Sequence, residues 1–139
     1  MTISVGAPKA AALASAIEEY EARIIHYFKF ESHEVRSHKQ ARGAEASAAI
    51  DKESMALLAR VPEGLEIVAV DQRGATWSSE ELAAYLEQLG VAGKEGVAFL
   101  IGGALGLSDA LRARSHRLLS LSSFTLPHEM ARLVLAEQL

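Results

Sequence analysis

Two adjacent glycines, Gly102 and Gly103, directly follow a run of five apolar residues, 97–101. Such a run is typical of a strand buried on both faces, and it is too short to span a membrane. Glycine can take positive φ and lets a ligand approach the bare backbone, and Ser108 is placed to cap a following helix. A strand that ends in a glycine turn before a helix is where open α/β sheets bind ligands, although such turns also occur without a ligand.

A second candidate binding segment runs over residues 120–128, Ser-Leu-Ser-Ser-Phe-Thr-Leu-Pro-His. Its pattern indicates the apolar end of a strand and then a loop rich in hydroxyl groups. Pro127 is placed in the first turn of a last helix, where a missing N–H costs no hydrogen bond. This second strand end favours the interpretation of the glycine turn as a ligand-binding turn.

Together, the segments 101–108 and 120–128 resemble the SPOUT-class methyltransferases, and more narrowly the RlmH family, which methylates N3 of a pseudouridine in large-subunit (23S) ribosomal RNA. The resemblance covers nearly the whole chain and is specific from about Ile67 onward. Family members have a longer first strand than residues 2–5 here. They also carry about a dozen residues beyond the last helix that contribute to the active site, and those residues cannot be carried over to this chain. The positions that support the resemblance are Val70-Asp71, Gly74, Trp77, 79–83, 131–133 and 136–139.

The resemblance implies S-adenosyl-L-methionine as the cofactor, held by three loops. The residues it assigns to cofactor binding are Val70, Asp71, Gly102, Gly103, Leu121, Ser122, Ser123, Phe124, Thr125 and Leu126. The cofactor carries no phosphate, so its slot needs apolar walls and backbone hydrogen bonds rather than a cradle of basic residues. Val70 and Leu121 are also expected in the core whether or not they touch a cofactor. Asp71 is as well explained by a turn at a strand end as by a contact to ribose.

His128 and Arg132 are the two candidates for polar assistance to methyl transfer. They lie four residues apart on the predicted last helix and therefore on one face of it. Transfer to a ring nitrogen mainly requires alignment of donor and acceptor and removal of the N3 proton. We interpret Arg132 as an anchor for RNA or the active site, and His128 as a support near the cofactor loop. The plain alternative is a histidine at a helix start and an arginine on the surface.

Composition restricts the classes of protein that remain. The 139 residues are half hydrophobic and predict one domain, residues 1–139, and the absence of cysteine excludes disulfides and thiolate metal sites. A formal net charge of −4 argues against a general polyanion binder, so RNA recognition would be local and shape-dependent, on an assembled ribosome. No leader or long apolar segment is evident, and we expect a cytoplasmic protein. The basic residues gather in two groups, Arg36, His38, Lys39 and Arg42, and Arg112, Arg114, His116 and Arg117.

The elements that would position these residues alternate along the chain. Apolar spacing predicts helices over 9–27, 44–59, from 78 or 79, over 108–115 and from 127, and strands over 2–5, 28–35, 65–70, 97–101 and 117–122. Five strands alternating with helices define an α/β fold with a mainly parallel sheet covered on both faces. The resemblance adds a C-terminal trefoil knot and a homodimer, with the apolar side of the last helix as a partner surface.

Three functions remain open from the sequence. The first is S-adenosylmethionine-dependent methylation of N3 of a pseudouridine in 23S ribosomal RNA. The second is a SPOUT-like protein that binds the cofactor or the ribosome without turnover, because the family's tail is missing. The third is an unrelated nucleotide- or phosphate-binding domain that shares only the glycine turns.

Overall fold

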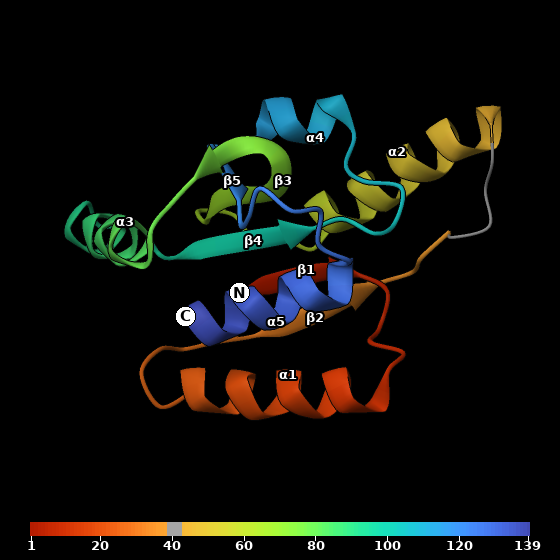
Figure 1. Ribbon diagram of the computed structural model, residues 1–139. Coiled ribbons are helices and arrows are strands. Elements are labelled where there is room, and N and C mark those ends of the chain that lie inside the picture. The colour runs from red at the N-terminus through yellow and green to blue at the C-terminus, as the bar shows by residue number, and fades with distance from the viewer. Residues whose placement is uncertain (39–42) are drawn as a thin grey trace.

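The computed structural model describes residues 1–38 and 43–139, in which five strands alternate with five helices (Figure 1). The strands are β1 (Thr2–Val5), β2 (Ser32–Val35), β3 (Glu66–Thr76), β4 (Val97–Ile101) and β5 (Arg117–Ser120). The helices are α1 (Ala11–Ile24), α2 (Ala44–Ala59), α3 (Ser79–Val91), α4 (Asp109–Arg114) and α5 (His128–Gln138). The predicted α/β fold is confirmed. Of the first basic group, Lys39 and Arg42 lie outside the described residues.

The five strands form one sheet in the order β2-β1-β4-β3-β5, and every pairing is parallel. Helices α2 and α4 pack on one face of the sheet, and α3 and α5 pack on the other. Helix α1 packs against α5 below the β2 edge in Figure 1. Because the strands are parallel, their carboxyl ends all lie at one edge of the sheet, on the right of Figure 1.

Strand β4 is the centre of the core. Its side chains alternate between the two faces: Ala98 and Leu100 join the cluster under α2 and α4, whereas Phe99 and Ile101 join the cluster under α3 and α5. All four are at most 2% exposed. A strand buried on both faces has no polar side to display, which explains its continuous apolar sequence.

The strand predicted over 28–35 is wrong in its first half. The backbone N–H groups of Tyr27 and Phe28 both donate to the carbonyl of Ile24 at 2.9 Å, so the chain makes a further turn after α1. Phe28 is 51% exposed and does not enter the sheet. The alternating pattern at 28–31 therefore belongs to a turn, and β2 begins only at Ser32.

Strand β3 is longer than predicted, because its end pairs with β5 a second time. The regular pairing reaches Val70 opposite Leu119, and after an irregularity Ala75 again lies opposite Leu119. Gly74 makes this return possible, since a Cβ there would lie 2.5 Å from the carbonyl carbon and oxygen of Leu118. The segment 72–76, predicted as a loop, thus remains attached to the sheet. Strand β5 is shorter than predicted and ends at Ser120.

Two predicted helix starts are confirmed by their caps. The Ser78 side chain accepts from the N–H of Glu81, whose carboxylate accepts from the N–H of Ser78 in return. Ser108 accepts from the N–H of Leu111 at 3.1 Å and begins α4. In both cases the serine oxygen satisfies a backbone donor that the helix leaves free.

In the described part of the chain, no helix is both long enough and apolar enough to cross a membrane. The trefoil knot stays a prediction, since the pairings establish the strand order rather than the threading of the last helix.

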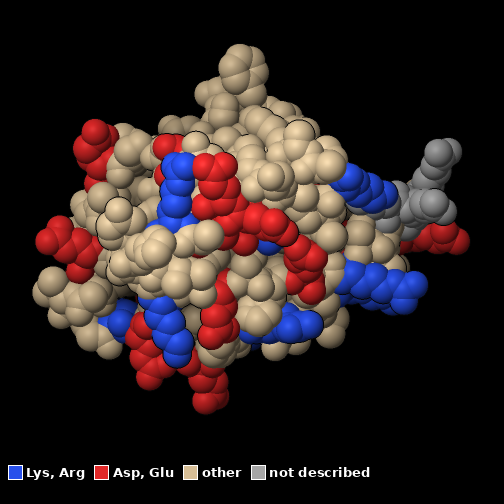
Figure 2. All heavy atoms as spheres, turned by 90° about the horizontal axis from the view of Figure 1, so that it is seen from below, with Lys and Arg blue, Asp and Glu red and all other residues tan. Residues whose placement is uncertain are grey.

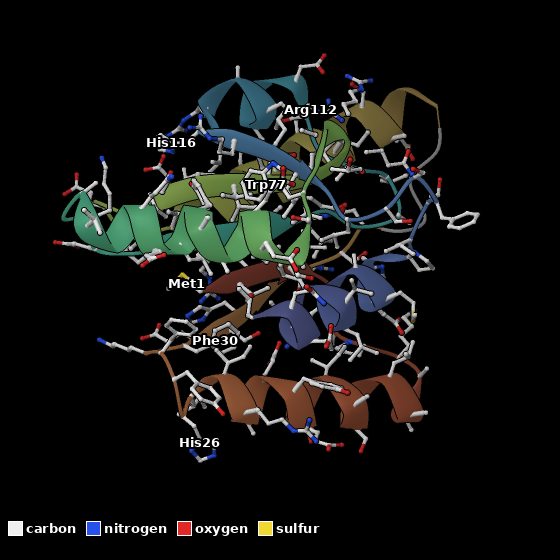
Figure 3. All side chains as sticks on the ribbon, turned by 60° about the vertical axis from the view of Figure 1, so that its left-hand side comes forward. Met1, His26, Phe30, Trp77, Arg112 and His116 are labelled. Atoms are coloured by element: carbon white, nitrogen blue, oxygen red, sulfur yellow. The ribbon has the colours of Figure 1, made fainter. Side chains whose placement is uncertain are left out.

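His116 directly precedes β5, at the amino end of that strand, and makes a contact that can be tested (Figure 3). The ring Nδ1 of His116 accepts from the backbone N–H of Ile67 at 2.9 Å, and the backbone N–H of His116 donates to the Ile67 carbonyl at 2.8 Å. We expect His116→Ala to lower the free energy of unfolding by about 1 kcal/mol, because the Ile67 N–H loses its acceptor. His116→Asn keeps an acceptor and should cost less. Urea unfolding measures both variants, and equal losses would contradict the role of the ring nitrogen.

Candidate functional site

A cleft of about 560 Å³ lies at the carboxyl edge of the sheet, outside β3, β4 and β5. Three segments that are far apart in sequence form most of its wall, residues 70–73, 101–107 and 120–128 without Ser123. Nine of the ten residues predicted to bind the cofactor line this cleft. Ser123 is exposed in the same loop but is not part of the wall. The structure therefore brings together the three loops that the sequence singled out.

The glycine pair at the end of β4 is required by the packing of the chain itself. A Cβ on Gly102 would lie 2.9 Å from Leu107, and a Cβ on Gly103 would lie 2.9 Å from Val5. Both glycines also contribute to the cleft wall. The positive φ expected in this turn occurs at Gly106, with φ of 86°, whose N–H donates to the Gly103 carbonyl at 3.0 Å. Sequence reasoning did not assign Gly106 to the site, although its spacing after the glycine pair was a usable signal.

Asp71 is held in place by hydrogen bonds within the chain. One carboxylate oxygen accepts from the N–H of Arg73, and the other accepts from Nε of Arg112, both at 2.8 Å. Arg112, which comes from α4 (Figure 3), donates at 2.7 Å to Asp109 as well. The side chains of Asp71 and Arg112 are only 8% and 17% exposed. Asp71 thus fixes Arg112 in the cleft wall. The sequence had indicated Arg112 only as a member of the second basic group.

The hydroxyl groups of the 120–125 loop mainly hold the loop together. Ser120 donates to the Ser122 carbonyl at 2.9 Å, and the Ser122 hydroxyl accepts from the N–H of Phe124 at 3.0 Å. Gln72 donates to the hydroxyl of Thr125, which ties this loop to the end of β3. Gln72 is a wall residue that sequence reasoning missed. The Phe124 ring is 81% exposed at the rim of the cleft.

His128 lies where the cleft meets the end of β1. It is the first residue of α5, it lines the cleft, and its side chain is 11% exposed. Its Nε2 atom is 3.7 Å from the position of a Cβ on Gly6, the residue after β1, and 3.9 Å from a carboxylate oxygen of Glu129. The predicted place of His128 beside the cofactor loop agrees with this geometry.

Arg132 does not line the cleft, although it follows His128 by one helical turn. Its guanidinium points to α1 and β2, where it donates to Glu21 at 2.9 Å, to Glu34 at 2.7 Å and to the Ser32 hydroxyl at 2.9 Å. Burial alone would lower the pKa of Arg132, but the hydrogen bonds and charges of Glu21 and Glu34 raise it above its ordinary value. In this chain Arg132 is thus a buried cross-link between α5, α1 and β2.

The charges in the wall suit a ligand without phosphate. The cleft wall contains two arginines, Arg73 and Arg112, and each forms an ion pair with Asp109 or Asp71. Between them the wall consists largely of aliphatic side chains and of backbone at the glycine turn. A bound phosphate would have to compete with these carboxylates for the arginines. This arrangement disfavours the phosphate-binding alternative and fits an apolar slot with backbone hydrogen bonds.

Glu53, on α2, is a buried carboxylate on the other side of the glycine turn. It is 1% exposed, and its Oε1 lies 3.5 Å from the position of a Cβ on Gly103. Its Oε2 accepts one long hydrogen bond, 3.4 Å, from the backbone N–H of His38. Burial raises the pKa of the Glu53 carboxyl, and the bond from His38 offsets this only in part. No sequence signal had marked this residue.

The fold and the cleft agree with the family comparison. All 139 residues match the model of a family described as predicted SPOUT methyltransferase, and the chain belongs to this family. The resemblance noted in the sequence is thereby confirmed.

Curated relatives narrow the comparison to one kind of methyltransferase. A protein of Gemmatimonas aurantiaca is 42% identical over 135 residues, covering 97% of this chain and 86% of the relative. Proteins of Alkaliphilus oremlandii and Listeria welshimeri are 39% and 41% identical, covering 99% and 98% of this chain and 88% and 87% of the relatives. Each of the three is named Ribosomal RNA large subunit methyltransferase H.

Replacing Arg132 should affect stability rather than ligand binding. We expect Arg132→Ala to lower the free energy of unfolding by about 2–4 kcal/mol, because two carboxylates lose their buried partner. Arg23, in an exposed pair with Glu19, is the matched control, and Arg23→Ala should cost about 0.5 kcal/mol or less. Thermal unfolding measures both. An Arg132→Ala protein of normal stability that had lost methyl transfer would instead support the catalytic role predicted from the sequence.

Replacing Glu53 should alter the dependence of stability on pH. The raised pKa means that folding favours the protonated carboxyl, so this stabilisation is present at low pH and is lost as pH rises through the raised value. Glu53→Gln removes the titration and keeps an acceptor for the His38 N–H. We expect the variant to melt a few degrees above the parent at pH 8 and at nearly the same temperature at pH 4. A difference in melting temperature that does not change with pH would contradict this assignment.

Proposed function

We propose that this protein transfers a methyl group from S-adenosyl-L-methionine to ribosomal RNA of the large subunit, at N3 of a pseudouridine. The supporting observation is the cleft formed by three separate loops, in a chain about 40% identical to proteins named for methylation of this RNA. The methyl donor and the target atom come from the resemblance to the family. Since the proposed substrate is ribosomal RNA, the expected compartment is the cytoplasm.

The cleft offers what the cofactor requires. Its volume lies within the usual range for small-molecule sites, and Val70, Leu121 and Leu126 supply apolar walls for an adenosine. The bare backbone of Gly102 and Gly103 is available for hydrogen bonds. When bound, S-adenosylmethionine supplies an activated methyl group on a sulfonium centre.

The protein's own contribution would be alignment and control of a proton. Rigid attachment of the three loops to the sheet fixes the donor, and a fixed donor accounts for much of the rate of an in-line transfer. His128 borders the cleft, and histidine is the side chain best suited to exchange a proton near neutral pH. We assign His128 to assist at the acceptor and leave Arg132 as the cross-link that holds α5.

We also propose a homodimer. Met130, Leu133 and Val134 lie along α5 and are only partly covered by the rest of the chain. Apolar side chains in this state on a terminal helix are suited to packing against a second copy.

Calorimetric titration with a matched pair of variants tests the cofactor site. Thr125 and Ser123 are both exposed in the same loop, but only Thr125 lines the cleft. We expect S-adenosylmethionine and S-adenosylhomocysteine to bind the parent and Ser123→Trp alike. Thr125→Trp should bind at least about tenfold more weakly, because the indole would occupy the cleft. ATP should bind none of them. A substitution in the glycine turn, such as Gly103→Val, would not test cofactor binding alone, because the new side chain would collide with Val5 and disturb the core.

Transfer of a labelled methyl group to ribosomes purified from cells that lack this protein tests the reaction. Incorporation into large-subunit RNA supports the proposal. Binding of the cofactor without incorporation would support the alternative of a binding protein without turnover. Failure of the parent to bind S-adenosylmethionine would overturn the methyl-transfer proposal and would leave only a protein that binds the ribosome without turnover.

A further inference from the structure

The strand order places a second ligand position beside the cofactor cleft. Strands β1 and β4 are neighbours in the sheet. The connection after β1 leads to β2 on one side of this pair, whereas the connection after β4 leads to β5 on the other side. In open α/β sheets, the crevice outside the carboxyl ends of two such strands is a preferred binding position. The cofactor cleft lies outside β3, β4 and β5 and includes no residue of β1 or β2. The cofactor cleft thus covers the β4 side of this crevice and leaves the β1 side outside its wall.

A second hollow, of about 860 Å³, lies next to this crevice, outside the carboxyl ends of β1 and β2. Residues 6–9, which follow β1, and 34–38, at the end of β2, form its wall together with Glu45. Gly6, which has a φ of 78°, forms one part of this wall with backbone alone. A Cβ at Gly6 would lie 3.5 Å from Ser37 and 3.7 Å from Nε2 of His128. His128 lines the cofactor cleft and not the second hollow, so it lies between the two, next to Gly6.

The wall of the hollow contains two basic side chains, Lys9 and Arg36, and two acidic ones, Glu34 and Glu45. Lys9 and Arg36 are exposed, and within the described residues neither side chain forms an ion pair. Glu34, in the same wall, is already paired with Arg132 at 2.7 Å. Figure 2, seen from the α1 side, shows Lys and Arg side chains toward the right-hand end of the molecule, with an acidic side chain at the tip, and basic and acidic side chains mixed across its centre and left. The two basic side chains of the hollow are suited to contact the phosphates of a nucleic acid.

His38 supplies a directed polar group in the wall. Its Nδ1 atom is buried and has no hydrogen-bond partner among the described residues. Its backbone N–H is held by the buried carboxylate of Glu53, which also lies against the glycine turn of the cofactor cleft. A buried polar atom without a partner is uncommon. Because Nδ1 has almost no accessible surface, a base edge would satisfy it once the imidazole turns toward the hollow. Glu53 is thus a positioning residue that ties His38 to the same framework as the cleft.

We propose that this second hollow binds the acceptor strand, a single-stranded segment of RNA with a pyrimidine nucleotide at Gly6 and His38 and its phosphates at Lys9 and Arg36. This proposal rests on the proposed function, because it identifies where that reaction's substrate lies. The position brings the acceptor base to His128, at the border with the cofactor cleft. Backbone without a side chain at Gly6 lets the flat base approach closely.

Nuclear magnetic resonance of the full chain tests the position directly. The labelled protein, saturated with S-adenosylhomocysteine, is titrated with a single-stranded oligoribonucleotide of about ten residues that contains one pseudouridine. We expect amide shifts concentrated at Gly6, Ser37, His38 and Gly103. Shifts confined to α3 or to the amino edge of the sheet, or no shifts at millimolar RNA, would overturn the proposal.

Paired charge variants separate this site from general attraction to RNA. Lys9→Ala with Arg36→Ala should weaken RNA binding about tenfold and reduce the slope of log affinity against log salt by about 1.4, because each phosphate left without its cation contributes about 0.7. Arg60→Ala with Lys94→Ala removes two exposed cations that lie near the amino ends of β3 and β4, and it should leave both quantities nearly unchanged. Equal effects of the two pairs would overturn the proposal.

Measuring the affinity for S-adenosylhomocysteine distinguishes a failure of this RNA-site proposal from a failure of the proposed function. S-adenosylhomocysteine should bind the Lys9→Ala, Arg36→Ala protein as it binds the parent, because neither residue lines the cofactor cleft. If the parent fails to bind S-adenosylhomocysteine, the proposed function is wrong. If the parent binds it and the RNA results are negative, only the assignment of the second hollow is wrong.

Discussion

Close packing against the backbone of three glycines, at positions where no side chain fits, shapes the region of the cleft. At Gly74 the chain passes over β5 so closely that a Cβ would fall 2.5 Å from the Leu118 carbonyl. At Gly102 and Gly103 a Cβ would fall 2.9 Å from Leu107 and Val5. These approaches hold the chain after the first wall segment, and the second wall segment itself, against the sheet and the core. Any larger residue there would have to displace the backbone or the core, so the shape of the cleft depends on them.

A buried charge cluster holds the last helix in the same framework. Arg132 connects α5 to Glu21 on α1 and to Ser32 and Glu34 on β2. Helix α5 begins at His128, directly after the third wall segment. The orientation of His128 toward Gly6 therefore depends on contacts made one turn further along the helix. Removing one member of such a cluster leaves a buried charge without its partner, so the cluster favours a single position of α5.

Much of the fold and of the cleft was predictable, because both follow from local patterns. The apolar run 97–101 and the serine caps at Ser78 and Ser108 correctly predicted β4 and the starts of α3 and α4. The three loops that line the cleft were singled out from the motifs of the family resemblance. Long-range pairing was not predictable: the second pairing of β3 with β5 depends on Gly74 meeting Leu118, and sequence spacing carries no record of that contact.

The same reason explains the residues whose surroundings were not anticipated. Helical spacing put His128 and Arg132 on one face of α5, but the two side chains differ in surroundings because α1 and β2 cover only Arg132. Glu53 and Gln72 gave no signal, since their importance comes from neighbours distant in sequence.

The position of His128 has a thermodynamic consequence. One side chain forms part of the wall of the cofactor cleft and lies within van der Waals reach of Gly6 in the second hollow. Two ligands that share a wall cannot bind independently if either one changes the rotamer or the charge of that wall. Linkage then requires that the factor by which cofactor alters RNA affinity equals the factor by which RNA alters cofactor affinity. A single imidazole would thereby make each ligand change the affinity of the other by the same factor, whichever of the two binds first.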